Sequence, residues 1–250
     1  MKETFKPKAN KPPDTFLNSI RFFLRLVLDL QTISIYRDLK DYLKNTNGNF
    51  LDLGCGDSPY RFLLNEKTNI YHGIDIIDST EFDYSRTDIL HFDGLNIPFE
   101  DNYFDNLICT EVLEHVLEFQ SLVNEVYRVL KPGGSALFTI PWSARFHYIP
   151  NDYYRYTPSA LKVIFSEFSE VLIRNRGTDI TSVSSKLIVL YFRNLIPTIT
   201  WKYIFTPIWF LLSPLVLIFA IIGQLSLFWN TGSELDPLGY TIILKKIDKD

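Results

Sequence analysis

Residues 50–57 read Phe50-Leu51-Asp52-Leu53-Gly54-Cys55-Gly56-Asp57, and this stretch decides the fold. A short apolar run that stops at glycines predicts a buried strand followed by a tight turn. Gly54 and Gly56 lack the Cβ that would hold a ligand away from the backbone, and both tolerate positive φ. The stretch therefore predicts a nucleotide-cofactor loop, with Gly54, Cys55 and Gly56 as cofactor contacts. Asp52, at the strand end, is expected either to contact the cofactor or to hydrogen-bond structurally.

The residues after the loop predict a helix and then a second strand. Ser58 is a good N-cap and Pro59 suits the first helical position, so a helix is expected over residues 60–65. The strand over residues 70–75 ends in Asp75, followed by Ile76, about 20 residues after the loop, as in dinucleotide-binding units. Asp75 can accept both hydroxyls of a ribose.

These features fit either a nicotinamide cofactor or S-adenosylmethionine. Pro59 stands where the third glycine of G-x-G-x-x-G belongs, and that glycine permits close packing of helix on strand in nicotinamide enzymes. Proline at this position therefore argues against a nicotinamide cofactor.

Further motifs follow in order: Asp93-Gly94-Leu95-Asn96-Ile97-Pro98-Phe99, residues 102–110 ending in Thr110, Glu111-Val112-Leu113-Glu114-His115-Val116, and Val129-Leu130-Lys131-Pro132-Gly133-Gly134. With the glycine loop, they make the chain resemble the class I S-adenosylmethionine-dependent methyltransferases, in particular the subfamily that carries L-D-x-G-C-G. The resemblance implies S-adenosylmethionine as cofactor and Asp93 as a contact of the adenine amino group. It places residues 111–116 on a helix after the fourth strand. Asp75, Ile76, Asp93, Gly94 and Thr110 are expected around the cofactor.

Strands expected over residues 49–53, 70–75, 106–110, 135–141 and 170–176 alternate with helical stretches. This order predicts an α/β fold with a doubly wound, Rossmann-like and mostly parallel sheet. Residues 240–244 are expected as a last strand, which in the resembling family is antiparallel, after a hydrophobic helical insertion. The expected units are a basic arm and amphipathic helix (1–32), a methyltransferase core (33–180), a hydrophobic hairpin (181–232) and the final strand (233–250).

The chain has 250 residues and a formal net charge of −4, so it has no basic footprint for nucleic acid. Its two cysteines, Cys55 and Cys109, form no disulfide pattern and suggest a reducing, cytoplasmic compartment. His72 and His91 lie beside strands and are expected in structural roles.

Two apolar segments flank the core. An amphipathic helix is expected over residues 14–30, with Arg21 and Arg25 opposite its apolar side, lying on a membrane surface or packed on the protein. It follows a basic arm with Lys2, Lys6, Lys8 and Lys11. Residues 203–229 carry no charge, but Pro207 and Pro214 interrupt the run, so we expect two short helices that dip into one leaflet. The alternative is an apolar dimer interface or a substrate cover.

Residues 141–158 form a loop of high aromatic and charged density after the fifth strand. The loop resembles the H-x-x-P-x-D-Y-x-R-[FY]-T stretch of methyltransferases from surface-glycan pathways. His147 is the candidate general base, because imidazole titrates near neutral pH. Asp152 and Arg155 are equally suited to pin the loop as a structural pair.

Glu111, Glu114 and His115 have the spacing of one helical face. No metal is expected, since acids are favoured in a first helical turn and the same string occurs in the family without one. The alternative is a divalent metal held by these three residues, with His147 as a fourth ligand.

Together these features predict a methyltransferase at the cytoplasmic face of the membrane, peripheral or monotopic. The expected acceptor is the hydroxyl of a lipid-linked glycan or another membrane-associated molecule. The alternatives are a prenylated quinone headgroup, or a catalytically silent scaffold in a membrane complex. The acceptor's identity, the methylated atom and the oligomeric state stay open.

Overall fold

The computed structural model describes residues 10–76 and 88–248. The basic arm expected at the N-terminus falls mostly on residues outside this range. Strands β1 (Gly48–Leu53), β2 (Asn69–Ile76), β3 (Leu90–Phe92), β4 (Phe104–Thr110), β5 (Leu130–Pro141), β6 (Glu170–Arg176) and β7 (Gly239–Lys245) form one sheet. Their order is β3-β2-β1-β4-β5-β7-β6.

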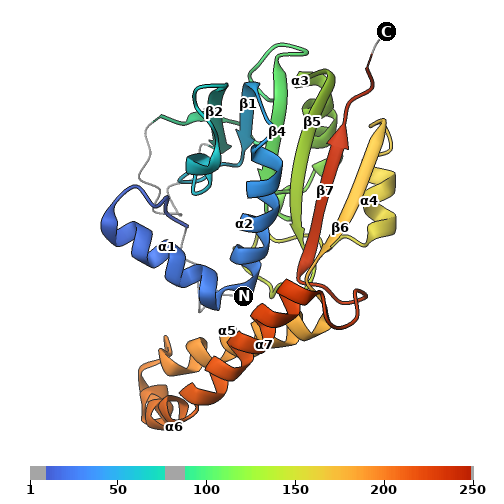
Figure 1. Cartoon of the computed structure of the whole chain (residues 1–250). Helices are drawn as coiled ribbons and strands as arrows, with labels where there is room; N and C mark the ends of the chain where they lie inside the picture. Colours follow the sequence, from blue (N-terminus) through green and yellow to red (C-terminus); the bar gives the residue numbers. More distant parts are fainter. Residues whose placement is uncertain (1–9, 77–87, 249–250) are drawn as a thin grey trace.

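The sheet is parallel except at its last inserted strand, as the sequence predicts. The pairs β1·β2, β1·β4, β2·β3 and β4·β5 are parallel, whereas β7 is antiparallel to both β5 and β6. The chain forms β6 first and then returns to place β7 between β5 and β6 (Figure 1). The predicted α/β, Rossmann-like architecture is confirmed.

Apolar side chains of the central strands alternate between two cores, one on each face of the sheet. Phe50, Ile108 and Leu137 pack against α2 (Leu30–Leu43). Their neighbours Leu51, Leu107 and Phe138 face the other core, which contains side chains of α3 (Phe119–Val129) and α4 (Pro158–Ile164). Helices therefore cover both faces, as expected for strands with near-continuous apolar runs.

The N-terminal helix differs from the prediction for residues 14–30. α1 (Phe16–Leu28) ends at Asp29, which also caps the start of α2 through a hydrogen bond from the Thr32 amide. Asp29 is extended, so one predicted helix becomes the end of one and the beginning of another, and α2 spans the expected boundary at residue 32. α1 packs inward through Phe22 and Leu26, buries Leu28 in part, and leaves its other apolar side chains exposed.

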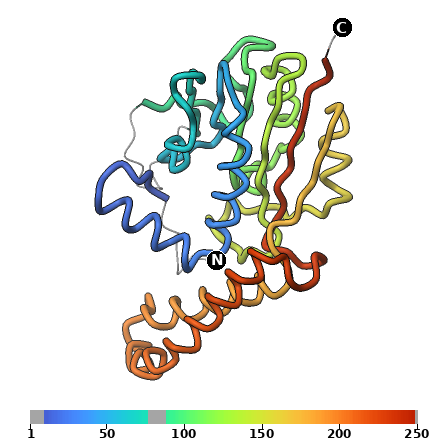
Figure 2. The backbone as a smooth tube through the Cα atoms, in the orientation of Figure 1, coloured from blue at the N-terminus to red at the C-terminus, as the bar shows by residue number. Residues whose placement is uncertain are grey.

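A helical excursion joins β6 to β7. It comprises α5 (Asp179–Leu195), a short 3₁₀ segment η4 (Thr200–Phe205), α6 (Thr206–Leu211) and α7 (Ser213–Trp229). Figure 2 shows α5 and α7 side by side: α5 leads away from the sheet and α7 leads back to it, and α6 lies at the end of the hairpin farthest from the sheet. The sequence predicted a hairpin made from the two halves of residues 203–229. That pairing is wrong: α7 pairs with α5, and the proline-rich segment between them forms the bend.

The uncharged run is bent at Leu212, between α6 and α7. Within the described residues no one helix has both the length and the apolar composition needed to cross a membrane. The pair Thr200–Leu211 and Ser213–Trp229, which meets at 65°, satisfies those two criteria only when taken together.

The excursion leaves and rejoins the sheet at one edge. α5 begins just after Arg176 at the carboxyl end of β6, and β7 begins at Gly239, which pairs with both Arg176 and Pro141. That edge is also where the parallel strands β1, β4 and β5 end. The helical hairpin is therefore anchored at the carboxyl ends of the parallel strands, which is where ligands bind in open α/β sheets.

Candidate functional site

The glycine loop after β1 forms the turn that the sequence predicts. Gly54 has φ +71° and Gly56 has φ +50°, in the left-handed region that favours glycine. A Cβ at Gly54 would overlap the side chain of Val112. The amides of Gly54 and Cys55 both donate to the carbonyl of Ile74 (2.9 and 3.1 Å), so the loop is tied to β2. The backbone of this loop is open to a ligand because Gly54 and Gly56 have no side chains.

Asp75 holds this loop from the end of β2. Its Oδ2 accepts the Gly56 amide at 2.6 Å and its Oδ1 accepts the Ile76 amide at 2.7 Å. Burial raises the pKa of Asp75, and these backbone donors oppose the shift. Each carboxylate oxygen keeps a lone pair for a further donor. The residues thus fit a ribose, whose hydroxyls donate, beside a backbone left open by glycine.

The helix expected over residues 60–65 does not form. Only a single 3₁₀ turn, η1 (Arg61–Leu63), is present. Ser58 has φ +52° and its hydroxyl lies 2.8 Å from the Tyr71 hydroxyl, so it caps no helix. A contact across the sheet thus outweighs the local capping preference of Ser58.

Asp52 is buried and faces Tyr71. The Tyr71 hydroxyl lies 2.8 Å from Asp52 Oδ2. Burial raises the pKa of Asp52 to about 7, partly opposed by this hydrogen bond. Of its two expected roles, these contacts support the structural one.

The end of β3 brings two more expected cofactor residues beside β2. Asp93 follows Phe92, which pairs with Ile76, and a Cβ on Gly94 (φ +86°) would lie 3.3 Å from Ile76. Asp93 is exposed, and hydrogen bonds from the side chain and amide of Asn96 and from the Leu95 amide lower its pKa. Ile76, Asp93 and Gly94 therefore form one corner next to Asp75, with an ionised carboxylate on its outer side.

The two remaining expected cofactor contacts are Cys55, within the glycine loop, and Thr110, at the end of β4. Cys55 and Cys109 are both free and buried, and burial raises the pKa of each thiol, so neither is a nucleophile at neutral pH. Thr110 ends β4, half-buried, and pairs with Thr139 of β5.

Glu111 is in a different place from the one the sequence predicts. It has φ +54°, which breaks the chain direction after β4, and residues 111–116 contain only the 3₁₀ turn Leu113–His115. Its carboxylate accepts a hydrogen bond from Arg176 Nη2 at 2.6 Å. Arg176 also donates to the Ile140 carbonyl and to Gln31 Oε1, from a side chain that is fully buried. Sequence reasoning missed Arg176, because nothing local links positions 65 residues apart.

Asp152 organises the loop after β5. Arg155 donates to both oxygens of Asp152 (2.6 and 2.8 Å), and the His147 amide donates to Oδ2 at 3.0 Å. Burial alone would raise the pKa of Asp152, but the hydrogen bonds from Arg155 and His147 lower it overall. The bidentate geometry supports the structural role that the sequence left open for this pair.

The same network orients His147. Its Nδ1 lies 2.9 Å from the Arg145 carbonyl and 3.0 Å from Asp152 Oδ2. Two oxygen acceptors at Nδ1 assign the proton of the neutral ring to that nitrogen, and Nε2 is then the proton-accepting atom. The carboxylate–imidazole arrangement is suited to general base chemistry.

Two neighbours complete this cluster. Glu114 and His115 have ligand atoms that lie with one of His147 within 4.8 Å of one another. Glu111 is not among them, so its inclusion in the alternative metal-binding set is wrong. The other three residues of that set, Glu114, His115 and His147, do lie together. Glu114 is fully buried, and in the described part of the chain neither carboxylate oxygen has a hydrogen-bond partner. Burial raises its pKa well above the usual range and lowers that of His115 to about 4.

The two other histidines sit as expected beside strands. His72 packs edge-on against Phe99, Tyr103 and Phe104, whereas His91 is exposed on β3.

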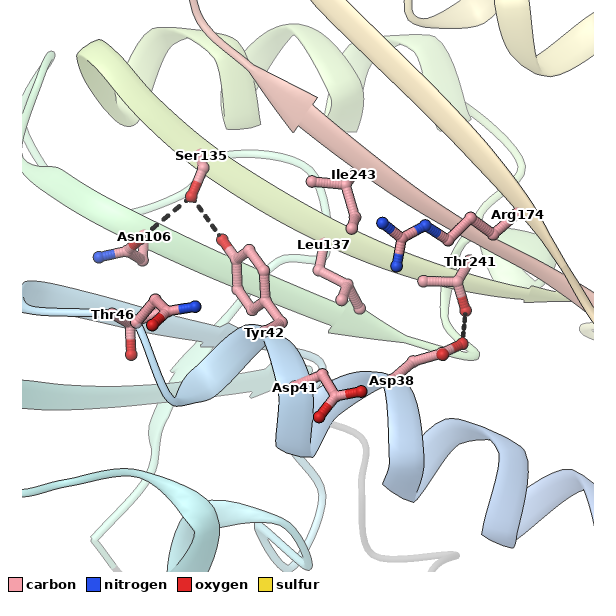
Figure 3. Close-up of a pocket in the computed structure, with 11 residues that line it drawn as sticks. Asp38, Asp41, Tyr42, Thr46, Asn106, Ser135, Leu137, Arg174, Thr241 and Ile243 are labelled. Carbon is pink, nitrogen blue, oxygen red and sulfur yellow. Dashed lines mark hydrogen bonds between the residues drawn. The ribbon is translucent and has the colours of Figure 1, made fainter. Parts of the chain in front are cut away.

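A separate groove of about 350 Å³ lies between α2 and the sheet (Figure 3). Its polar side chains bond to one another: Tyr42 to Ser135 at 2.8 Å, Ser135 to Asn106 at 3.0 Å, and Thr241 to Asp38. Asn106 and Ser135 lie toward the amino ends of their strands, away from the glycine loop. The groove contains none of the expected site residues.

Comparison with known proteins agrees with this geometry. Residues 51–138 match a family model described as a methyltransferase domain. The demethylmenaquinone methyltransferase of Listeria monocytogenes is 28% identical over 153 residues, which cover 54% of this chain and 62% of that protein. The chain thus matches less than two thirds of this relative's length.

Solved structures extend the likeness to most of the fold. A SAM-dependent methyltransferase from Archaeoglobus fulgidus superposes with a TM-score of 0.53 at 18% identity, covering 90% of this chain and 99% of that one. The [4+2]-cyclase SpnF superposes with a TM-score of 0.52 at 19% identity, covering 88% and 82%. Residues 51–138 therefore match the methyltransferase domain family, and the chain has the fold of S-adenosylmethionine-dependent methyltransferases, which supports S-adenosylmethionine as the cofactor.

Proposed function

We propose that the chain is an enzyme that transfers the methyl group of S-adenosylmethionine to an acceptor carried by a membrane lipid. The observation that supports methyl transfer most directly is the pairing of Asp75 with the Gly56 amide inside the matched domain. It combines a backbone cradle with a buried carboxylate at the sheet edge where ligands bind. The cofactor supplies an activated methyl group, so the protein needs chiefly to bind, align and remove a proton.

The proposed site has two groups of residues, one that would bind the cofactor and one that would act on the acceptor. Gly54, Gly56, Asp75 and Asp93 would hold the cofactor, with Asp75 at the ribose and Asp93 at the adenine. His147 would accept a proton from the acceptor hydroxyl at Nε2. Asp152 would stabilise the imidazolium that results, through its contact with Nδ1. Arg155 keeps Asp152 ionised and in place.

Two classes of acceptor are proposed. A lipid-linked glycan comes first, on the resemblance of the His147 loop to methyltransferases of surface-glycan pathways. A prenylated quinone headgroup is the second, and the name of the Listeria relative favours it. Both are amphipathic and are reached from the membrane surface, so we propose the cytoplasmic membrane face as the site of action.

Mass spectrometry of lipid extracts from cells with and without the gene tests this function. A lipid that is one methyl group heavier only when the gene is present, and absent with the Asp75→Ala variant, would support it. An unchanged lipid profile, together with intact cofactor binding by the purified protein, would favour the silent scaffold instead. A heavier glycan fragment or a heavier quinone fragment separates the two acceptor classes.

A further inference from the structure

Large apolar side chains are exposed on α1 and on the helical hairpin. On α1, Phe23 is 50% exposed and Leu24 is 60% exposed. On α6 and α7, the exposed fraction is 69% at Phe210, 59% at Leu217 and 58% at Ile221. Contiguous apolar patches of this kind on a folded protein mark interaction sites.

α1 and the hairpin are packed into one unit. Gln224 of α7 donates from Nε2 to the carbonyls of Leu26 and Val27, both at 2.9 Å, and so caps the last turn of α1. Gly223 allows this approach, because a Cβ there would overlap the Leu30 side chain. Leu30 is fully buried with Ile188, Val216 and Ala220 of the hairpin. The two exposed faces are therefore fixed relative to each other.

The charge of these segments favours an anionic partner. Residues 180–233 contain Lys186, Arg193 and Lys202 but no acidic residue, and α1 contributes Arg21, whereas its Arg25 pairs with Asp29 at 3.0 Å. Lys186, Arg193 and Arg21 are exposed. Apolar helices flanked by lysine and arginine are the pattern of interfacial membrane binding.

The unit also adjoins the proposed acceptor loop. The amides of Trp142 and Ser143 both donate to the carbonyl of Leu238, on the segment that returns from α7 to β7 (3.0 Å each). The Trp142 indole donates to Asp236, whose carbonyl accepts from Ser182 of α5. The start of the loop is thus bonded to the segment that returns from α7, and Ser182 ties that segment to α5.

We propose that α1 and the α5–α7 hairpin together form a single docking surface for an anionic lipid bilayer, which orients the His147 loop toward lipid-borne acceptors. Both ends of the hairpin join the same sheet, so the hairpin enters and leaves the bilayer from one side. Docking needs neither cofactor nor catalysis. Its role in acceptor choice rests on the proposed function.

Flotation of the full-length protein with vesicles tests the docking surface. The vesicles contain phosphatidylcholine with phosphatidylglycerol, or phosphatidylcholine alone. We expect stronger binding to the anionic vesicles and substantial binding in high salt, since apolar burial is not screened by ions. Leu217→Asp with Ile221→Asp on α7, and separately Phe23→Asp with Leu24→Asp on α1, should each lower the vesicle-bound fraction at least about tenfold.

Val163→Asp is the matched control, because Val163 is 74% exposed on α4, away from the proposed surface. It should bind vesicles like the parent. Binding of S-adenosylhomocysteine, measured by calorimetry for every variant, shows that each one is folded. If the parent binds S-adenosylhomocysteine but does not float with the vesicles, the docking surface is wrong and the proposed methyl transfer is unaffected. The same conclusion would follow if the protein were a soluble dimer whose interface is formed by α1 and the hairpin. An effect of the α7 pair alone would overturn the single shared surface. A parent that floats but binds no S-adenosylhomocysteine would contradict the proposed enzyme only.

Discussion

Asp75 Oδ2 accepts the Gly56 amide at 2.6 Å, so the residue expected to bind ribose also fixes the turn of the cofactor loop. Asp75→Ala should weaken S-adenosylmethionine binding at least tenfold, because it removes acceptors worth about 1.5–3 kcal/mol each and releases the loop. Calorimetry measures the affinity. Asp101→Ala, an exposed carboxylate at the opposite strand ends, is the control and should bind normally. Unchanged affinity in Asp75→Ala, or NAD binding by the parent, would contradict the cofactor site.

His147→Ala should lower methyl transfer by about 10²–10⁴-fold and leave cofactor affinity nearly constant. The reason is that His147 lies on the loop after β5, whereas the expected cofactor residues lie at the carboxyl ends of β1, β2, β3 and β4. Single-turnover rates and calorimetry separate the two quantities. Asp152→Asn should produce a smaller loss, because it removes the charge that stabilises the imidazolium. Parent-like turnover in His147→Ala would leave that residue with a structural role only.

Chelators should leave turnover unchanged. Burial raises the pKa of Glu114 well above the usual range, which disfavours the carboxylate form that a metal ligand requires. Activity is compared before and after dialysis against EDTA. If activity falls and a divalent ion restores it, then Glu114, His115 and His147 hold a metal and His147 is no free base.

Arg176→Met should destabilise the fold by about 3 kcal/mol, because Glu111 and the Ile140 carbonyl lose a buried charged donor. Urea unfolding of the detergent-solubilised protein gives the change. Arg174→Met on the same strand is the control, because Arg174 is exposed. Equal stability in the two variants would show that the buried pair contributes nothing.

Asp52 should make stability fall as pH rises. Its folded pKa of about 7 lies above the ordinary 3.8, so between these values the folded state holds a proton that the unfolded state has lost. The stabilisation is complete below about pH 4 and lost above about pH 7, and amounts to up to about 4 kcal/mol. Asp52→Asn should flatten the unfolding free energy across this window relative to the parent. If the unfolding free energies of the parent and Asp52→Asn depend on pH in the same way, the raised pKa of Asp52 is refuted.

Six of the seven strands could be predicted from the sequence, because they are runs rich in apolar residues bounded by turn residues. The three-residue strand β3 (Leu90–Phe92) was missed, because it is too short to show such a pattern. The 170–176 strand and the antiparallel last strand lie where they were expected. The glycine loop and Asp75 were predicted from the order of strand, turn and strand, whereas Asp93 was predicted from the family resemblance. In the structure Gly54 follows β1, Asp75 lies near the end of β2 and Asp93 follows β3. Their cofactor contacts stay predictions.

Errors arose where a long-range contact outweighed a local preference. Ser58 bonds Tyr71 and not a helix end, and Glu111 turns toward Arg176 and so leaves the helical face expected for it. Periodicity also could not tell which helix pairs with α7, because α5 and residues 203–212 are both apolar. The break at Asp29 was missed because apolar residues continue on both sides of it.

Transfer of a radiolabelled methyl group from S-adenosylmethionine to membrane lipid is the most direct measurement. Purified protein is incubated with the labelled cofactor and a total lipid extract in vesicles, and the organic phase is counted. We predict label in the lipid phase with the parent, and at least about tenfold less with Asp75→Ala or His147→Ala at a cofactor concentration near the parent's affinity. Absence of lipid label from a parent that binds S-adenosylmethionine and floats with the vesicles would contradict a lipid-borne acceptor.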